Sequence, residues 1–321
     1  MVKVATKNPP ILVTGSHRSG KGLLIGAINL NDNFNIIQEP LNPKSKIGWT
    51  GITVPYYYMY IDDSLKNTYK KELSSTIHDY KYRVFKQLKE IKKPREYLGV
   101  LKDILTSCKL RLNWKRLLID DPFALLSAEW FYFEFGARVI IMIRHPASFV
   151  SSLKLLNYEF PFSDLLNQED LINKKLLKYL PEINEYANNR KSIVEQGALL
   201  WRLLYEVVLQ YKWEFGSQWL FVRFEDIVRF PEVYLPEIYN YIDLPKKGIN
   251  FQELKKKYSL SFSRSDREVK LLINQNRIKN NYSVEGHLEI YKSILNKSEI
   301  ELVKNTTKEI WKQYYSEADW K

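Results

Sequence analysis

The fold is set by the stretch Ile11-Leu12-Val13-Thr14-Gly15-Ser16-His17-Arg18-Ser19-Gly20-Lys21-Gly22-Leu23-Leu24. It begins with an apolar run typical of a β-strand, continues with a glycine-containing turn, and ends in apolar residues at helical spacing. A strand, a glycine loop and a helix in this order form a phosphate cradle, because loop N–H groups and the positive end of the helix dipole point at one place. The stretch therefore predicts an anion-binding loop.

The loop also follows a known phosphate-binding pattern, with one departure. Residues 15–21 satisfy the first seven positions of G-x-x-x-x-G-K-[ST], but Gly22 occupies the position of the magnesium-binding hydroxyl. Arg18 and Lys21 add full positive charges, and Gly20 and Gly22 lack the Cβ that would keep backbone away from an oxyanion. A tight strand–helix turn with solvated cations is the alternative interpretation.

The composition is that of an ordinary globular protein with an excess of positive charge. The chain has 321 residues, of which 45% are hydrophobic and 27% charged, and a net charge of +12. This charge favours polyanionic partners such as nucleotides, nucleic acid, acidic glycans or a membrane surface. Because the cations are scattered, apart from short runs such as 255–257, a nucleic-acid groove is not indicated and we expect no nucleic-acid partner.

Cysteine and histidine usage excludes several kinds of site. The single cysteine, Cys108, excludes an intramolecular disulfide and a cysteine-based zinc site. The four histidines show no i, i+4 pair, so they form no metal motif. No apolar run is long enough to span a membrane, and the N-terminus has no apolar leader. We therefore expect no metal, no stable membrane insertion and a cytoplasmic location.

Strand-like runs alternate with helical patterns along the chain. After the first strand, such runs occur at 36–37, 117–119, 139–143 and 219–222. The alternation predicts an α/β fold with a mostly parallel sheet and helices on both faces. We expect a single domain over 1–321, with a helical insertion at about 64–113, a variable lid segment at about 157–190 and a basic C-terminal segment at about 245–321.

Polar side chains follow the ends of several predicted strands. Glu39 comes after the second strand, Asp120-Asp121 after the third, and Arg144-His145 after the fourth. Ligands of such sheets bind beyond the carboxyl ends of the strands, so we expect these residues and the loop at 15–22 to form one site.

Arg144 and Ser152 supply a second set of groups for an anion. Arg144 stands at a strand end and Ser152 lies eight residues later, two turns along the predicted helix. A guanidinium offers a bidentate fork and a serine a hydroxyl donor, so both suit one phosphate group.

Together these residues resemble the sulfotransferases that use 3′-phosphoadenosine 5′-phosphosulfate (PAPS). Segment 15–20 is similar to the motif that binds the 5′-phosphosulfate, and segment 143–152 to the motif that binds the 3′-phosphate. Segment 38–42 resembles the one that carries the catalytic carboxylate in tyrosylprotein and several carbohydrate sulfotransferases. Supporting similarities follow at 121–125 and 223–227, so the matches run in order over about residues 10–230.

The resemblance implies a P-loop NTPase-like three-layer fold and sulfuryl transfer from PAPS as co-substrate, without a metal. It implies that Glu39 is the general base. We expect Arg18, Lys21 and the loop amides to hold the phosphosulfate and the charge that develops on its leaving group. His17 and His145 are alternative bases. The residues expected to bind the nucleotide are Gly15, Ser16, His17, Arg18, Ser19, Gly20, Lys21, Gly22, Arg144 and Ser152.

Two positions depart from the family pattern. The family commonly has Thr-Thr where this chain has Lys21-Gly22, and a lysine where it has Asp120. We hypothesise that Lys21 supplies the cation lost before Asp121, and that Asp120 is its ionic partner.

Alternative functions and the acceptor stay open on the sequence alone. A P-loop kinase or ATPase is favoured by Gly20-Lys21 and by the strand ending in Asp120, and disfavoured by Gly22. A non-catalytic nucleotide-binding relative is the other alternative. If the chain is an enzyme, we expect the acceptor to be a carbohydrate hydroxyl, and a tyrosyl peptide or a small metabolite is the alternative. We expect the aromatic residues at 49–60 and the segment at 157–190 to shape the acceptor pocket.

Overall fold

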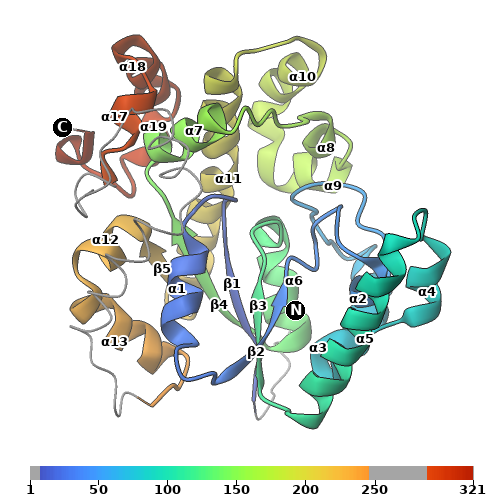
Figure 1. Cartoon of the computed structure of the whole chain (residues 1–321). Helices are drawn as coiled ribbons and strands as arrows, with labels where there is room; N and C mark the ends of the chain where they lie inside the picture. The colour runs from blue at the N-terminus through green and yellow to red at the C-terminus, as the bar shows by residue number, and fades with distance from the viewer. Residues whose placement is uncertain (1–7, 246–287, 321) are drawn as a thin grey trace.

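Five parallel strands form one sheet at the centre of the molecule (Figure 1). The computed structural model describes residues 8–245 and 288–320. The strand order is β2-β3-β1-β4-β5, and every neighbouring pair is parallel. The predicted α/β class and all five predicted strands are confirmed. The strands are β1 (Ile11–Gly15), β2 (Phe34–Gln38), β3 (Arg116–Asp120), β4 (Arg138–Ile143) and β5 (Leu220–Arg223).

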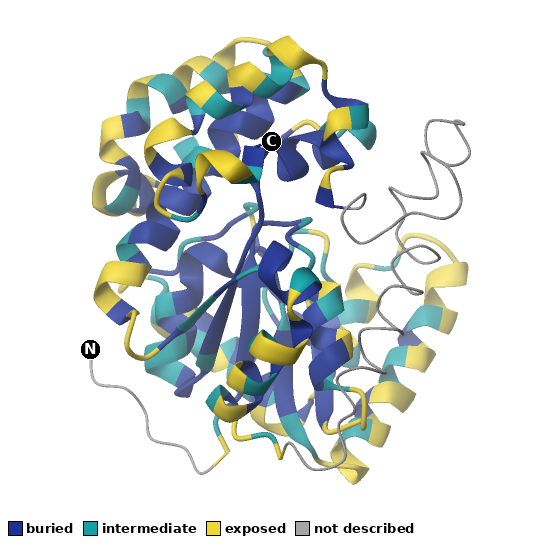
Figure 2. Cartoon of the chain, turned by 90° about the vertical axis from the view of Figure 1, so that its left-hand side faces the viewer, coloured by how far each residue is buried: buried dark blue, intermediate teal, exposed yellow. Residues whose placement is uncertain are grey.

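Both faces of the sheet are covered, which gives three layers. Successive side chains of a strand point to opposite faces, so Ile11 and Val13 join one core while Leu12 joins the other. In Figure 2 most strand residues are buried, those of β5 are mostly intermediate, and many exposed residues lie on the outer sides of the helices. One face carries α1 (Lys21–Ile28), α12 (Phe224–Arg229) and α13 (Pro231–Tyr241), and the other carries α6 (Ala128–Phe135) and α11 (Ile193–Phe215).

The predicted helical insertion after β2 is helical throughout its main part. It contains α3 (Lys66–Asp79), α4 (Val84–Lys89) and α5 (Arg95–Leu112), preceded by the short α2 (Ile47–Thr50). Pro94 stands at the N-terminal boundary of α5, where its missing N–H costs no helical hydrogen bond. These helices lie at the edge of the molecule beside β2 (Figure 1).

Residues 157–190 fold into short helices that share the larger core. Phe160, Leu165 and Ile183 are buried there together with residues of α11. The segment follows η1 (Leu125–Ser127) and α7 (Pro146–Leu155) along the chain, and contains α8 (Ser163–Leu166), α9 (Glu169–Leu171), η2 (Ile172–Leu176), η3 (Leu177–Tyr179) and α10 (Leu180–Asn188).

The C-terminal part departs from the sequence pattern. The periodicity of residues 298–315 predicts one amphipathic helix, and this is wrong, because the helix breaks at Thr307. The Thr307 N–H still donates to the carbonyl of Val303 (3.1 Å), as does its hydroxyl (2.7 Å), and the Trp311 indole nitrogen donates to the carbonyl of Lys304 (2.9 Å), the acceptor that the Lys308 N–H would use in a continuous helix. The elements are α17 (Tyr291–Ile294), α18 (Lys297–Thr306), α19 (Lys308–Trp311) and η4 (Glu317–Trp320). The predicted basic segment at 245–321 falls partly on residues 246–287 and 321, which lie outside the described residues.

None of the helices in the described ranges combines the length and the apolarity that a membrane span needs.

Candidate anion-binding site

The loop between β1 and α1 holds two glycines in backbone conformations that other residues rarely adopt. Gly15 (φ 147°) and Gly20 (φ 84°) adopt left-handed backbone conformations that favour glycine. A Cβ on Gly15 would lie 2.4 Å from the carbonyl oxygen of Met142, and one on Gly20 would lie 2.2 Å from the Phe224 ring. By contrast, a Cβ on Gly22 would meet no described atom within 4 Å, so open space lies beside the first turn of α1.

Arg18 joins the loop to the residues predicted for a second anion. Its Nε donates to Ser152 Oγ on α7 (2.9 Å), and its backbone carbonyl accepts from Nη1 of Arg144. Arg18 itself has a positive φ of 65°, which is uncommon for a residue with a side chain. Arg144 and Ser152 therefore both contact Arg18, and the three residues lie close together at one end of the sheet.

A buried tyrosine on α11 holds the same strand ends together. The Tyr205 hydroxyl is hydrogen-bonded to Ser16 Oγ (3.1 Å) and accepts from the backbone N–H of Arg144 (3.0 Å). One turn earlier on α11, Trp201 donates from its indole nitrogen to the carbonyl of Arg144 (2.9 Å). The backbone N–H and the carbonyl of Arg144 are thus both hydrogen-bonded to side chains of α11, which fixes the position of the Arg144 Cα.

The segment after β5 completes the support. The Phe224 ring lies beneath the Arg144 guanidinium, 5.3 Å from its centre, and also faces Gly20. Glu225 accepts from the backbone N–H of His145 (2.9 Å) and from the Tyr315 hydroxyl (2.9 Å). The segment after β5 therefore contacts both the loop at Gly20 and the residues that follow β4.

The hypothesised Lys21–Asp120 pair is present. Lys21 Nζ lies 3.2 Å from Asp120 Oδ1, and both side chains are largely buried. The pair connects the first turn of α1 to the end of β3. Burial reduces screening by water, so the pair fixes the position of the Lys21 charge.

Glu39 lies next to this pair at the end of β2. Its backbone N–H donates to the carbonyl of Asp120 (2.7 Å), and its Oε2 accepts from Asn42 Nδ2 (2.6 Å). Glu39 has a positive φ of 48°, and Ser45 donates from its hydroxyl to the Glu39 carbonyl. The carboxylate is half-buried and lines the same pocket as Asp120.

Asp121 has a structural role. Its carboxylate is fully buried and accepts from the backbone N–H groups of Leu41 (2.6 Å) and Phe123 (2.8 Å), which ties the loop after Glu39 to the turn after β3. Burial raises the pKa of Asp121 to about 7, although these N–H groups oppose the shift.

The two alternative bases, His17 and His145, are buried among aromatic rings. The backbone N–H of His17 donates to Tyr58 Oη (2.9 Å), and His17 Nδ1 lies 2.6 Å from the same hydroxyl. Burial, with Arg18 and Lys21 nearby, lowers the pKa of His17 to about 3. The His17 ring is therefore neutral at physiological pH and a weak base.

His145 lies in a cage made by the C-terminal segment. Its ring packs against Tyr291, Tyr315 and Trp320, with ring centres 4.4–5.5 Å apart. Within the described ranges, neither of its ring nitrogens has a hydrogen-bond partner. Burial lowers the pKa of His145 to about 3, so the ring is neutral at physiological pH.

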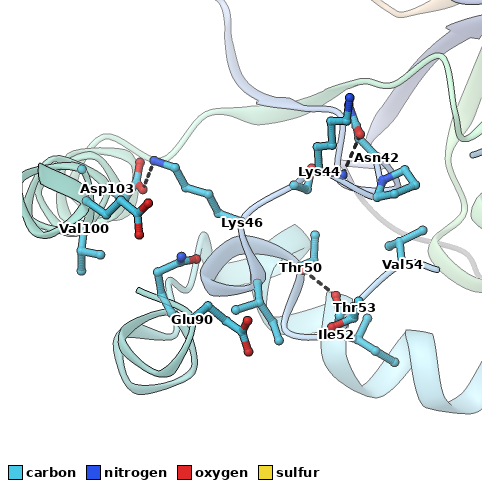
Figure 3. A pocket seen from close by; sticks show the side chains of 16 residues that line it. Asn42, Lys44, Lys46, Thr50, Ile52, Thr53, Val54, Glu90, Val100 and Asp103 are labelled. Carbon is cyan, nitrogen blue, oxygen red and sulfur yellow. Dashed lines mark hydrogen bonds and ion pairs between the residues drawn. The ribbon is translucent and has the colours of Figure 1, made fainter. Parts of the chain in front are cut away.

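Two adjoining pockets open beside Glu39. The one lined by Glu39 and Asp120 measures about 480 Å³, and its neighbour about 550 Å³. They share Asn42, Lys44, Ser45, Lys46 and Asp103. Figure 3 shows the second pocket, where Lys46 of the loop pairs with Asp103 of α5 (2.6 Å). The lining is rich in hydroxyl, amide and charged groups, which suits a polar ligand with several hydroxyls.

The described residues contain no group of three or more His, Cys, Asp or Glu placed to hold a metal ion.

Sequence reasoning missed the residues that support the site. Tyr205 and Trp201 stand in a helix whose sequence is apolar nearly throughout, so nothing in the pattern distinguishes them from core residues. Tyr58 was recognisable only as part of an aromatic run, and Phe224 only through the family resemblance.

Comparisons with known proteins bring only distant similarities. No protein-family model matches the sequence, and no curated protein matches it. Among solved structures, the chain is similar to a sulfotransferase domain from the curacin biosynthetic pathway, with 13% identity, a TM-score of 0.44, and coverage of 94% of this chain and 99% of that one.

Two further solved structures carry the same kind of description. One is a sulfotransferase domain from the Synechococcus PCC 7002 olefin synthase (17% identity, TM-score 0.41, covering 94% of this chain and 96% of that one). The other is a sulfotransferase from Alicyclobacillus acidocaldarius (14% identity, TM-score 0.37, covering 84% of this chain and 97% of that one).

A first prediction concerns Tyr205. Tyr205→Phe leaves a buried Arg144 N–H without its acceptor and Ser16 without its partner, so we expect a loss of roughly 1–3 kcal/mol in the free energy of unfolding. The matched control is Tyr211→Phe on the same helix, whose hydroxyl is equally buried but donates only to the carbonyl of Leu126. Urea unfolding measures both variants. An equal loss of unfolding free energy in the two variants would show that the hydrogen bonds of Tyr205 stabilise the protein no more than the single bond of Tyr211.

A second prediction concerns pH. His145 has a pKa of about 3 in the folded chain and an ordinary pKa of 6.5 when unfolded. The unfolded state therefore binds the proton first, and stability falls as pH drops from about 6.5 toward 3, by up to ~1.4 kcal/mol per pH unit. His145→Phe removes this term, so its unfolding free energy should fall less steeply.

The comparison at pH 8, where both states of the ring are neutral, serves as the internal control for packing changes. Parallel pH profiles for the wild type and His145→Phe in urea unfolding would contradict the assignment of a neutral, buried ring.

Proposed function

We propose that the chain is a sulfotransferase that moves a sulfuryl group from PAPS to an acceptor hydroxyl. The observation that carries the proposal is that Arg18, in the loop at 15–22, is hydrogen-bonded to both Arg144 and Ser152. A nucleotide with phosphate groups at both its 5′ and 3′ positions needs two anion-binding sets a short distance apart. The loop supports the first, and Arg144 with Ser152 supports the second.

The loop fits the 5′ end of such a nucleotide. Its backbone N–H groups and the start of α1 suit an anion, and the open space beside Gly22 leaves room for one. Arg18 and Lys21 add positive charge at the same place. Bound PAPS supplies the sulfuryl group and a phosphate leaving group.

The residues beside the loop can carry out transfer. Glu39 takes the proton that the acceptor hydroxyl loses as its oxygen bonds to sulfur. Arg18 and Lys21 stabilise the negative charge that develops on the phosphate oxygen as its bond to sulfur breaks. Asp120 holds Lys21 in position (3.2 Å), which keeps that charge directed at the loop.

A P-loop kinase is the less favoured reading. Position 22 carries no hydroxyl, and the carboxylate of Asp120, which would hold magnesium in such an enzyme, is engaged by Lys21. The proposed acceptor is a carbohydrate hydroxyl, because the pockets beside Glu39 are lined by hydroxyl, amide and charged groups together with Trp49. A tyrosyl peptide and a small metabolite are outcomes of an acceptor screen.

The test compares two nucleotides by thermal unfolding. A ligand that binds only the folded state stabilises it by RT ln(1 + [L]/Kd), about 2.7 kcal/mol at a hundredfold excess over Kd. We expect 3′-phosphoadenosine 5′-phosphate to raise the Tm without a metal, and ATP with magnesium to raise it less. If ATP with magnesium raises the Tm and 3′-phosphoadenosine 5′-phosphate does not, the sulfotransferase proposal is wrong and a kinase or ATPase takes its place.

The catalytic prediction concerns Glu39. Glu39→Gln keeps the shape and the bond to Asn42 but cannot accept a proton, so we expect transfer of labelled sulfate from PAPS to fall ~10²–10⁴-fold. Binding of 3′-phosphoadenosine 5′-phosphate should be unchanged, which is the control for folding. Wild-type turnover in this variant would remove Glu39 from the mechanism.

A further inference from the structure

Helix α5 carries an apolar stripe that faces solvent. Its members follow each other at alternating spacings of three and four residues, so they line one side of the helix. The four leucines are between 54% and 89% exposed, and the cysteine is exposed as well. The stripe consists of Leu98, Leu101, Leu105, Cys108 and Leu112.

The opposite side of α5 is held by the protein, so the stripe cannot turn inward. Val100 and Ser107 are buried, and the Ser107 hydroxyl donates to the carbonyl of Tyr80 (2.6 Å). Asp103 is paired with Lys46 (2.6 Å). These contacts fix the rotation of the helix about its axis and leave the leucines outside.

Further exposed apolar side chains occur on α5 and on the segments next to it. Phe85 on α4, which packs against α5, is 83% exposed. Tyr97 near the start of α5 and Trp114 just after its end are also exposed. Soluble proteins rarely expose apolar side chains in such a concentration unless the surface binds a partner.

The charges around the stripe identify the partner. Residues 84–116 contain ten basic and only three acidic residues. All three acidic residues, Glu90, Glu96 and Asp103, line the second pocket described above, which is shown in Figure 3. Lys102 and Lys109 of α5 are exposed. Of the ten basic residues, Lys86 is paired with Glu72, Lys115 with Asp32, and Arg116 donates to backbone carbonyls, while the other seven are exposed. The outward surface is thus apolar with an excess of positive charge, although Glu90 and Glu96 are exposed as well.

We propose that this surface of α4 and α5 docks on a membrane that carries anionic lipids. Leucine and aromatic side chains enter the boundary between headgroups and acyl chains, and the lysines and arginines beside them attract the lipid phosphates. Tyrosine and tryptophan are favoured at that boundary. The complementary charge is what selects this occupant.

The same charge disfavours the occupants that the chain itself could provide. A second copy docked through this surface would place two cationic surfaces together. Residues 246–287 carry ten basic and four acidic residues, so they do not complement it either.

Docking also bears on the acceptor. The inner side of α4 and α5 lines the pocket that adjoins the one lined by Glu39, so a membrane on the outer side lies within about one helix diameter, roughly 10–12 Å, of that adjoining pocket's wall. A hydroxyl on a lipid-borne headgroup or glycan is then the acceptor class within reach. This consequence rests on the proposed function, whereas the docking does not.

The experiment measures binding of the full chain to vesicles by flotation. Vesicles of phosphatidylcholine alone are compared with vesicles that also contain phosphatidylglycerol. We expect binding only to the second kind, weakened by salt because the attraction is electrostatic. The combined variant Leu101→Asn and Leu105→Asn, and separately Lys102→Glu and Lys109→Glu, should each weaken binding more than about tenfold.

Matched controls change equally exposed residues elsewhere. Leu177→Asn with Val233→Asn, and Lys297→Glu with Lys308→Glu, should bind vesicles as the wild type does. The Tm shift with 3′-phosphoadenosine 5′-phosphate should be the same in all variants, so a failed nucleotide experiment and a failed docking experiment are read separately.

Several results would overturn the docking. One is no binding to anionic vesicles, and another is binding that neither α5 variant reduces. A third is a dimer in sedimentation velocity that dissociates in the Leu101→Asn and Leu105→Asn variant, since a second copy would then cover the stripe. If the leucine variant does not fold, the lysine variant and the salt dependence give the same answer.

Discussion

The hydroxyl of Tyr205 is the point on which the site's geometry rests. It lies fully buried on α11 and bonds to Ser16 of the loop after β1 and to the backbone of Arg144 after β4. β1 and β4 are neighbours in the sheet, so the parallel ladder brings their ends close, but it does not fix the loops that follow. The Tyr205 hydroxyl fixes both loops because it is hydrogen-bonded to each of them, and Trp201 adds a second bond to Arg144. Such buried bonds are costly to break, which makes the arrangement rigid.

This rigidity lets the chain hold cationic side chains together at one end of the sheet. Arg18, Lys21 and Arg144 would repel one another, and the surrounding structure offsets that cost through contacts to Ser152, Asp120 and the Phe224 ring. The catalytic carboxylate proposed here, Glu39, is tied to the same framework through its backbone bond to Asp120.

The sequence was sufficient for the sheet and for the loop. Apolar runs bounded by turn residues predict all five strands, and the parallel order brings the predicted polar residues to one edge. The Lys21–Asp120 pair was also predictable, because two unusual residues occur at neighbouring strand ends. Residue patterns could not predict Tyr205, Tyr58 or Trp201, because a buried hydroxyl or indole looks like any other aromatic core residue until the chain is folded.

The exposure of the α5 leucines could not be predicted from the sequence for the opposite reason. Apolar residues at helical spacing normally mark the buried side, and only the pairing of Asp103 and Ser107 with the protein shows that this helix is turned the other way.

The most direct measurement is a crystal structure of the chain with 3′-phosphoadenosine 5′-phosphate. The account predicts the 5′-phosphate on the loop at 15–22 beside Lys21, and the 3′-phosphate between Arg144 and Ser152, with Arg18 contacting it. A nucleotide bound elsewhere, or one whose 3′-phosphate lies away from Arg144, would contradict it.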